Sequence, residues 1–288
     1  MSTAQPSQVF MADGGDPEMQ RAYEQARDSF RYFWREIAWD RRRIVPALEL
    51  AALKAPFTDD ASRPGSGDAP EVEHMWLSDV DFDGEVVSGV LGNEPNWLTS
   101  VHAGDAVRIP LDRISDWMYV KSGIAYGAFT VNLLRSRMDP GERREHDQAW
   151  GLDFGDPRTV RMDADDPHPF SETMASSLGE SLARDPSLLS VKGNNGWTLL
   201  HQETSAGSAA TVRVLLDAGA DPGAVADNGM TPLQLAKVLG WESVAGLLDG
   251  GQSGPARPAR MGAAPDASNQ GDGVDPPARK RLWWRFWG

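Results

Sequence analysis

The chain has 288 residues, a formal net charge of −14 and no cysteine. Its length is enough for two modest domains, and the missing cysteines exclude disulfides, thiol nucleophiles and cysteine-based zinc sites. The residues from Pro255 to Gly288 hold six Lys or Arg and three Asp, which is +3 and leaves −17 for the remainder. Because an acidic body repels phosphate, we expect no nucleic-acid partner.

The N-terminus lacks the basic and apolar segments of a secretory signal. Apolar runs also stay well short of the roughly 20 residues that a membrane-spanning helix needs. The cytoplasm is therefore the expected location. Residues 1–15 are polar and contain glycine, and we expect them to be disordered.

A helix is predicted to begin at Pro17, with Asp16 as its N-cap. Three arginines, residues 41–43, are expected to interact with the C-terminus of this helix. For residues 47–57 helix propensity favours a helix, while two prolines and the short length leave a strand open. The apolar residues of the first helix recur at helical spacing and predict one buried face: Met19, Tyr23, Ala26, Phe30, Phe33, Trp34 and Ile37.

After a loop rich in Asp, Ser, Gly and Pro, the hydrophobic period changes to two residues, which predicts β-strands. Residues 16–140 are therefore predicted to form an α+β domain, in which the N-terminal helix packs on an antiparallel sheet or small barrel. The expected β segments are residues 72–82, 86–91, 106–110, 114–121 and 124–134.

This first domain resembles the bacterial domain-of-unknown-function family 2314, from about residue 20 to residue 135. The resemblance rests on Asn93-x-Pro95, on Ile114-Ser115-Asp116-Trp117 and on Gly127-x-x-Thr130. The family pattern has an Arg two residues after that Thr, where this chain has Asn132, so a binding role of that Arg would be missing here. The resemblance implies a fold and leaves the biochemistry open.

The second half contains an internal repeat, in which Thr198 aligns with Thr231 and Leu215 with Leu248. The period of 33 residues and the T-P-L opening resemble ankyrin repeats. The resemblance implies a protein-binding stack that uses its concave face. The expected units are a degenerate cap at 170–194 and repeats at 195–227 and 228–249.

A stack this short would be marginal alone, because roughly three repeats are needed to bury a continuous core. We therefore expect the ankyrin-like part, residues 170–249, to dock on the α+β domain or on the connector at 141–169. The connector is rich in Asp and Pro and is expected to contribute no core element.

The pair Asp116-Trp117 has two interpretations: a strand start with a core tryptophan, or a surface aromatic–carboxylate pair at a binding groove. An enzyme would use the same groove, with His102, Asp105 and Asp116 as its acid–base groups, although no nucleophile motif is present. The candidate groove residues are Asn93, Pro95, Trp97, Asp116, Trp117 and Thr130.

Metal-binding patterns are weak in this sequence. Residues 79–84 open like a calcium loop, but its twelfth position is Val90 instead of a glutamate, so a hairpin turn is the expected structure. His74 is expected to be a hydrogen-bonded core histidine and His201 a structural residue of the ankyrin pattern. Histidines at metal-ligand spacing and phosphate-binding loops are absent. We expect no metal, no cofactor and no catalytic residue.

Residues 250–278 are rich in Gly, Pro, Ser, Ala and Asp and are expected to form a disordered linker. The last ten residues, 279–288, then combine basic and aromatic side chains, which favour both anionic membrane surfaces and protein hot spots. The alternatives are anchoring at the inner membrane and docking on a partner or on the acidic body. The candidate tail residues are Arg279, Lys280, Arg281, Trp283, Trp284, Arg285, Phe286 and Trp287.

These patterns predict a non-catalytic bacterial interaction protein of the immunity or adaptor type, whose partner is an unidentified protein. Two alternatives are kept. One is an enzyme with its site in the groove of the α+β domain, and the other is a peripheral membrane adaptor held by the tail.

Overall fold

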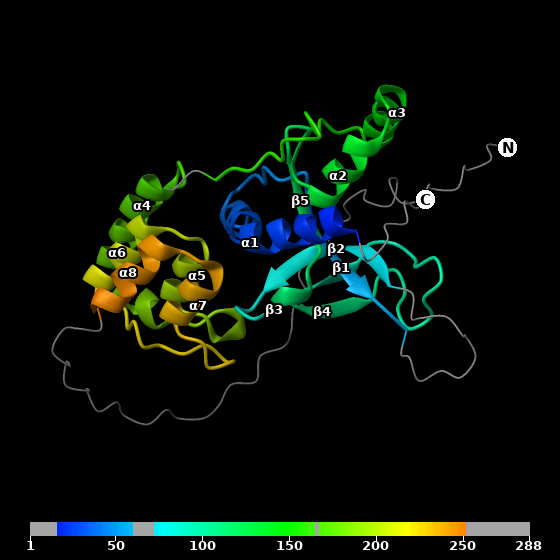
Figure 1. The fold of residues 1–288 in the computed structure, drawn as a ribbon. Helices are drawn as coiled ribbons and strands as arrows, with labels where there is room; N and C mark the ends of the chain where they lie inside the picture. The colour runs from blue at the N-terminus through cyan, green and yellow to red at the C-terminus, as the bar shows by residue number, and fades with distance from the viewer. Residues whose placement is uncertain (1–15, 60–71, 165–166, 252–288) are drawn as a thin grey trace.

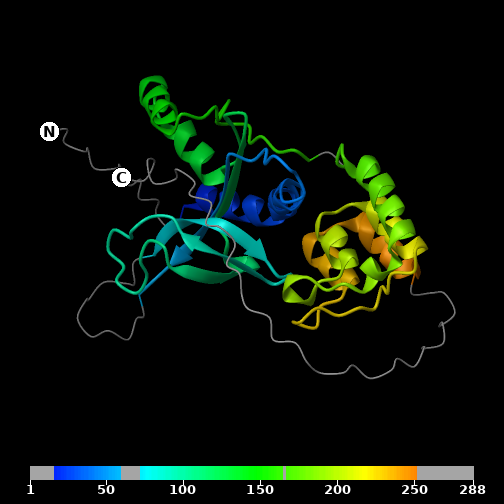
Figure 2. The same cartoon turned by 180° about the vertical axis from the view of Figure 1, so that it is seen from behind.

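The computed structural model describes residues 16–59, 72–164 and 167–251. It contains an α+β part and an all-α part, which lie next to each other (Figures 1 and 2). The predicted fold class is confirmed: an N-terminal helix packs on an antiparallel sheet, and a small helical stack follows.

Helix α1 (Pro17–Asp40) begins as predicted, because Asp16 accepts a hydrogen bond from the backbone N–H of Glu18 at 2.9 Å. Its apolar stripe is buried against the sheet. Phe33 stacks on Trp117 with ring centroids 5.6 Å apart, and such aromatic pairs stabilise a core beyond the area that they bury. The stripe is therefore a core element.

The arginines that follow α1 were expected to interact with its C-terminus, and the side chains of two of them also bind groups in other elements. Arg41 donates to Asp81 at 2.8 Å and to the carbonyl of Val80 at 2.9 Å. Arg42 donates to Glu203 at 3.0 Å. Carboxylates from other elements are stronger partners for a guanidinium than the end of a helix dipole.

The sheet has six antiparallel strands in the order β4-β3-β2-β1-β5-β6. It is an open sheet, because the edge strands β4 and β6 do not pair with each other in the described residues. The strands are β1 (Leu50–Phe57), β2 (Glu73–Phe82), β3 (Val86–Leu91), β4 (Ala106–Pro110), β5 (Asp116–Lys121) and β6 (Ile124–Gly127).

The segment for which helix and strand were both open, residues 47–57, contains strand β1. This strand pairs with β2 on one side and with β5 on the other. A central position in a sheet overrides helix propensity, because two ladders of hydrogen bonds outweigh a preference of a few tenths of a kcal/mol per residue.

The predicted strand at residues 124–134 ends early. Strand β6 stops at Gly127, and helix α2 (Phe129–Arg137) begins two residues later. Ala128 has a φ of 58° in the left-handed region and turns the chain from strand to helix. The local pattern misled the prediction, because the turn is held by Asp116 in another strand.

The connector at residues 141–169 carries more structure than predicted. Helix α3 (Pro140–Trp150) starts with a full capping box at Asp139. Phe154 is 1% exposed on the face of the sheet opposite α1, and His168 stacks on Trp39 with ring centroids 4.8 Å apart. The expectation that this segment contributes no core is wrong.

The all-α part has two layers. Helices α4, α6 and α8 form one layer, and α5 and α7 form the other. The predicted repeat is seen directly, since Thr198 and Thr231 build equivalent capping boxes at the starts of α5 and α7. The helices are α4 (Ser171–Arg184), α5 (Leu199–Ser205), α6 (Ala209–Asp217), α7 (Pro232–Leu239) and α8 (Glu242–Gly251).

Candidate functional site

The most specific motif residues of the first domain gather around the carboxylate of Asp116. This side chain is 0% exposed. It accepts hydrogen bonds from the backbone N–H groups of Trp117, Phe129 and Thr130, and from the Thr130 hydroxyl at 2.5 Å. Helix α2 has no capping side chain of its own. Asp116 therefore caps α2 from a neighbouring strand and lies at the positive end of its dipole.

Lys54 supplies the charge opposite Asp116. The two residues are partners in the β1–β5 register, and Lys54 Nζ lies 3.4 Å from Thr130 Oγ1. Burial raises the pKa of Asp116, while the Thr130 hydrogen bond and the Lys54 charge lower it. Burial also lowers the pKa of Lys54, against the attraction of Asp116. Each charge thus offsets part of the desolvation cost of the other.

His74 extends the same network. Its Nδ1 lies 2.9 Å from Ser115 Oγ, and its Nε2 lies 3.3 Å from the hydroxyl of Tyr23, whose ring stacks on the imidazole. Burial and the nearby Lys54 charge lower the pKa of His74 to about 4. The residue is therefore a neutral, hydrogen-bonded core histidine at pH 7, as predicted.

The surface interpretation of Asp116-Trp117 is wrong. Trp117 is 0% exposed, and its indole N–H donates to the carbonyl of Ala26 in α1 at 2.9 Å. Gly127 shows how closely this ring is packed, since a Cβ added there would lie 2.3 Å from Trp117, and φ is +74°. The pair is a strand start with a core tryptophan, which was the other interpretation.

The remaining groove candidates, Asn93, Pro95 and Trp97, lie in the loop between β3 and β4. Glu73 organises this loop by accepting from the backbone N–H of Asn96 at 2.9 Å and from its side-chain amide at 2.6 Å. In the described part of the chain, no hydrogen bond joins this loop to Asp116, Trp117 or Thr130. The groove that would combine this loop with Asp116, Trp117 and Thr130 therefore has no support from a hydrogen bond between the two sets of residues.

The acid–base trio of the enzyme alternative does not converge either. His102 pairs with Glu94 at 2.9 Å on a side chain that is 62% exposed, and Glu94 raises the pKa of His102. Asp105 accepts from the backbone N–H of His102 and so closes a turn. Asp116, by contrast, is fully buried in its own network.

The feature that sequence reasoning missed is a group of arginines in and just after α1 that contact the ankyrin part and the connector. Arg31 donates to the carbonyl of Gly240 at 3.1 Å, and Arg42 donates to Glu203 at 3.0 Å. Arg35, one helical turn after Arg31, donates to a carbonyl in the connector. Arg31 and Arg35 are four residues apart and therefore lie on one face of α1, and that spacing is the signal that could have revealed the contact.

These contacts confirm that the helical stack docks on the α+β domain. The ring of Tyr32 meets Trp241 edge-on with centroids 5.9 Å apart. Asn228 donates to the carbonyl of Asp83 at 3.1 Å, at the β2–β3 turn. Of the two helical layers, α5 and α7 are the one toward α1 and the sheet (Figure 1).

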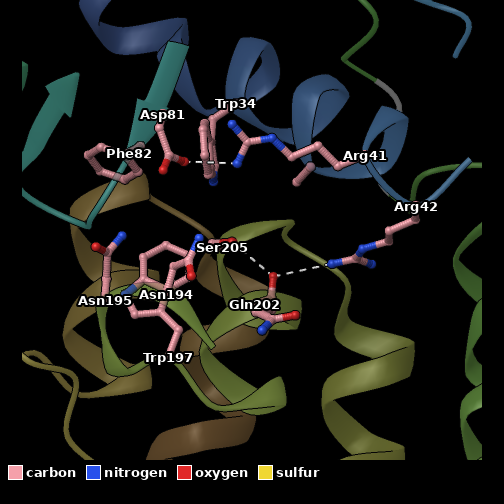
Figure 3. Close-up of a pocket in the computed structure, with 11 residues that line it drawn as sticks. Trp34, Arg41, Arg42, Asp81, Phe82, Asn194, Asn195, Trp197, Gln202 and Ser205 are labelled. Atoms are coloured by element: carbon pink, nitrogen blue, oxygen red, sulfur yellow. Dashed lines mark hydrogen bonds and ion pairs between the residues drawn. The ribbon is translucent and has the colours of Figure 1, made fainter. Parts of the chain in front are cut away.

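A pocket of about 310 Å³ opens between α1, the end of β2 and the start of the ankyrin part (Figure 3). Its cations are already paired, Arg41 with Asp81 at 2.8 Å and Arg42 with Glu203 at 3.0 Å. The volume lies at the lower end of the range for ligand sites. We call it the junction pocket; it is lined by Trp34, Ala38, Arg41, Arg42, Asp81, Phe82, Asn194, Asn195, Trp197, Gln202 and Ser205.

Comparison with known proteins places both parts. Residues 16–154 match the family described as an uncharacterized protein conserved in bacteria (DUF2314), and residues 195–227 match the ankyrin repeat. The first match extends beyond the resemblance seen in the sequence, to the segment that holds α3 and Phe154. The fold and these matches define the class: an ankyrin repeat protein, which is a protein-interaction module.

A relative from Neisseria meningitidis serogroup B, whose name describes it as an ankyrin repeat protein, is 41% identical over 251 residues, which are 84% of this chain and 97% of the relative. The uncharacterized protein YegJ of Escherichia coli K12 is 36% identical over 83 residues, which are 29% of this chain and 48% of that protein. The chain belongs to the family of bacterial ankyrin repeat proteins with this amino-terminal domain.

The tail candidates, residues 279–288, lie outside the described residues, so their role stays a prediction. Within the described ranges, no helix is long and apolar enough to cross a membrane. The same ranges hold no group of three or more His, Cys, Asp or Glu side chains that could bind a metal ion.

Proposed function

We propose that this protein is a non-catalytic interaction protein of the immunity or adaptor type, acting in the bacterial cytoplasm. Its partner protein binds over the junction pocket and contacts both domains at once. The observation that carries this proposal is the composition of the pocket walls. Trp34 and Asp81 come from the α+β domain, whereas Asn195 and Gln202 come from the ankyrin part.

The position of the pocket also fits an ankyrin mode of binding. The layer formed by α5 and α7 contains the first helix of each repeat, and part of it lies against α1. Met230, just before α7, packs directly against the β2–β3 turn, since a Cβ added to Gly84 would lie 2.5 Å from its sulfur. A partner that approaches this layer therefore meets the α+β domain beside it.

The Asp116 network supports a non-catalytic role for the first domain. Asp116 is occupied by four donors, and its neighbour His74 holds Ser115 and Tyr23. A general base needs a free lone pair directed at a substrate proton. The polar atoms of Asp116 and His74 are instead engaged in hydrogen bonds that hold β5, α2 and α1 together.

Selection of peptides from a random display library on the full chain tests the proposal. Asn194 is exposed at the rim of the junction pocket, and Asn194→Arg would fill the entrance. Ser177→Arg places the same side chain at an exposed position of α4, in the other helical layer, and serves as the control. We expect selected peptides to bind the wild type and Ser177→Arg alike, and Asn194→Arg at least tenfold more weakly.

The proposal fails if no peptide is enriched above the level of a plain support. It also fails if the selected peptides bind Asn194→Arg as tightly as the wild type.

The membrane-adaptor alternative rests on the composition of residues 279–288. Co-sedimentation with anionic and neutral liposomes, for the full chain beside a chain ending at Gly250, tests it. Pelleting of the full chain alone, with anionic lipid and with release by salt, would support a membrane role, because basic side chains bind anionic headgroups electrostatically. Equal co-sedimentation of the two chains would rule out the membrane-adaptor alternative.

A further inference from the structure

We infer that the junction pocket recognises the main chain of an extended peptide segment through hydrogen-bonding groups that the protein itself leaves unused. This inference rests on the proposed function and specifies the ligand chemistry of the same site. It is carried by the buried indole N–H of Trp34, which has no hydrogen-bond partner, and by three amide side chains of the pocket lining that make no hydrogen bond within the described residues: Asn194, Asn195 and Gln202.

Trp34 provides a fixed donor. The side chain is 2% exposed, and its indole N–H has no hydrogen-bond partner. The ring is held by Phe82, edge-on with centroids 5.5 Å apart, and by the Arg41 guanidinium, 5.1 Å from the ring centroid. Its nitrogen is directed toward the ankyrin side of the pocket (Figure 3). A buried N–H without an acceptor is unfavourable, so a ligand carbonyl that reaches it removes an existing penalty.

The ankyrin part provides three amide side chains that can both donate and accept. Asn194 and Asn195 are exposed and Gln202 is half-buried. The dashed lines in Figure 3 join Arg41 to Asp81, and Arg42 and Ser205 to the main-chain carbonyl of Gln202, and none involves these amides. A side-chain amide has an N–H donor and a C=O acceptor like those of a peptide bond, so it can pair with a backbone C=O and a backbone N–H.

The charges of the pocket favour a neutral ligand over an anion. Arg41 is paired with Asp81, and Arg42 is paired with Glu203, which is 5% exposed. A phosphate or a carboxylate would therefore have to compete with existing ion pairs. The aromatic wall, by contrast, suits one apolar side chain of the peptide.

The size of the pocket sets the length of the segment. A volume of about 310 Å³ admits a short stretch of extended chain and excludes a folded element. Because neither domain lines the pocket alone, the segment would bridge both. Binding of such a segment should also hold the two domains in their present arrangement.

The test is a conservative exchange that removes one donor. Trp34→Phe keeps a six-membered aromatic ring against Phe82 and removes the five-membered ring that carries the indole N–H group. The probe is the tightest peptide from the display selection, fluorescently labelled, with binding measured by anisotropy. We expect Trp34→Phe to weaken binding about threefold to tenfold, the range for a single net hydrogen bond.

Trp97→Phe is the matched control. Trp97 also has a buried indole N–H without a partner, but it lies in the β3–β4 loop, away from the pocket lining. Binding by this variant should stay within twofold of the wild type. The indole N–H signals of the 11 tryptophans in a nitrogen–proton correlation spectrum give a second readout. The signal that Trp34→Phe removes should shift when the peptide is added to the wild type.

Gln202→Met keeps the side-chain length without the amide, and it stands in if Trp34→Phe does not fold. It should weaken binding by a similar factor. Unchanged binding by both Trp34→Phe and Gln202→Met, with loss of binding in Asn194→Arg, overturns the main-chain inference and leaves the proposed function in place. Equal binding by Asn194→Arg and the wild type overturns the proposed function itself.

Discussion

Two polar regions of this protein differ in how their hydrogen-bonding groups are used. Around Asp116, the carboxylate, the Thr130 hydroxyl and the His74 imidazole all have protein partners. In the junction pocket, the Trp34 indole and the Gln202 amide have none in the described part of the chain. Groups that the protein satisfies stabilise the fold, whereas an unsatisfied group that lines a pocket can pair with a ligand.

The family motif residues and the candidate binding site therefore lie in different regions of the molecule. The residues that carry the family resemblance, such as Asp116 and Thr130, build the junction of β5 with α2. The surface with free hydrogen-bonding groups lies elsewhere, where two domains meet. The specific motif residues of this family member therefore act as fold determinants.

The largest effect is expected for Asp116→Asn. The amide cannot accept hydrogen bonds from all four donors, and it leaves the Lys54 charge without its counter-charge. We expect a loss of about 3 kcal/mol in the free energy of unfolding, measured by urea denaturation. A loss below about 1 kcal/mol would show that the network is not a main support of the fold.

Gly127→Ala should cost almost as much, about 2–3 kcal/mol, because it adds a clash with Trp117 to the strain of a positive φ. Gly123→Ala is the control, since its φ of +72° is similar and no atom lies within 4 Å of the added Cβ. That variant should lose only about 1 kcal/mol. Equal losses in the two variants would mean that packing on Trp117 adds nothing.

Glu203→Gln should weaken the contact between the domains by about 2 kcal/mol, because Arg42 and Thr211 both donate to this buried carboxylate. Faster proteolysis of the connector and a lower melting temperature would report the change. Asp81→Asn removes the partner of Arg41 in a pair that is 49% and 41% exposed, so it should cost less than about 1 kcal/mol. The opposite ranking would contradict the assignment of Glu203 as the main ionic contact.

Acid stability should depend on His74. Its pKa is about 4 in the folded protein and 6.5 in the unfolded chain. Between these values the unfolded state binds a proton that the folded state does not, so stability falls as the pH is lowered from 6.5 toward 4. His74→Gln should make this loss smaller by roughly 1–2 kcal/mol in denaturation curves at several pH values.

His102→Gln is the control for that series, since His102 is exposed and its pKa is raised instead of lowered. This variant should lose as much stability between pH 6.5 and pH 4 as the wild type does. An unchanged fall in His74→Gln would instead assign the acid sensitivity to other groups.

The smallest effect on stability is expected for Asn194→Ala in the junction pocket. This exposed amide has no hydrogen-bond partner in the described residues, so its removal should change the unfolding free energy by less than about 0.5 kcal/mol. Thermal denaturation measures this. A large loss would show that the amide supports the fold and would weaken the comparison between the two regions.

The sequence by itself determined the elements with strong local signals. Asp16 and Pro17 mark the start of α1, and the equivalent capping residues Thr198 and Thr231 mark the two repeats. Capping and periodicity depend on residues within a few positions of each other, so a sequence shows them directly. The docking of the stack was also predictable, because two repeats and a cap cannot bury a core alone.

Only the tertiary structure decided the rest. Residues 47–57 became a strand through pairing on both sides, and residues 124–134 divided into strand and helix because Asp116 caps the turn. The junction pocket joins Trp34 to Gln202, which are far apart in the chain. Hydrogen bonds and packing between distant segments leave no local period or spacing, and only the folded chain shows which polar groups have partners.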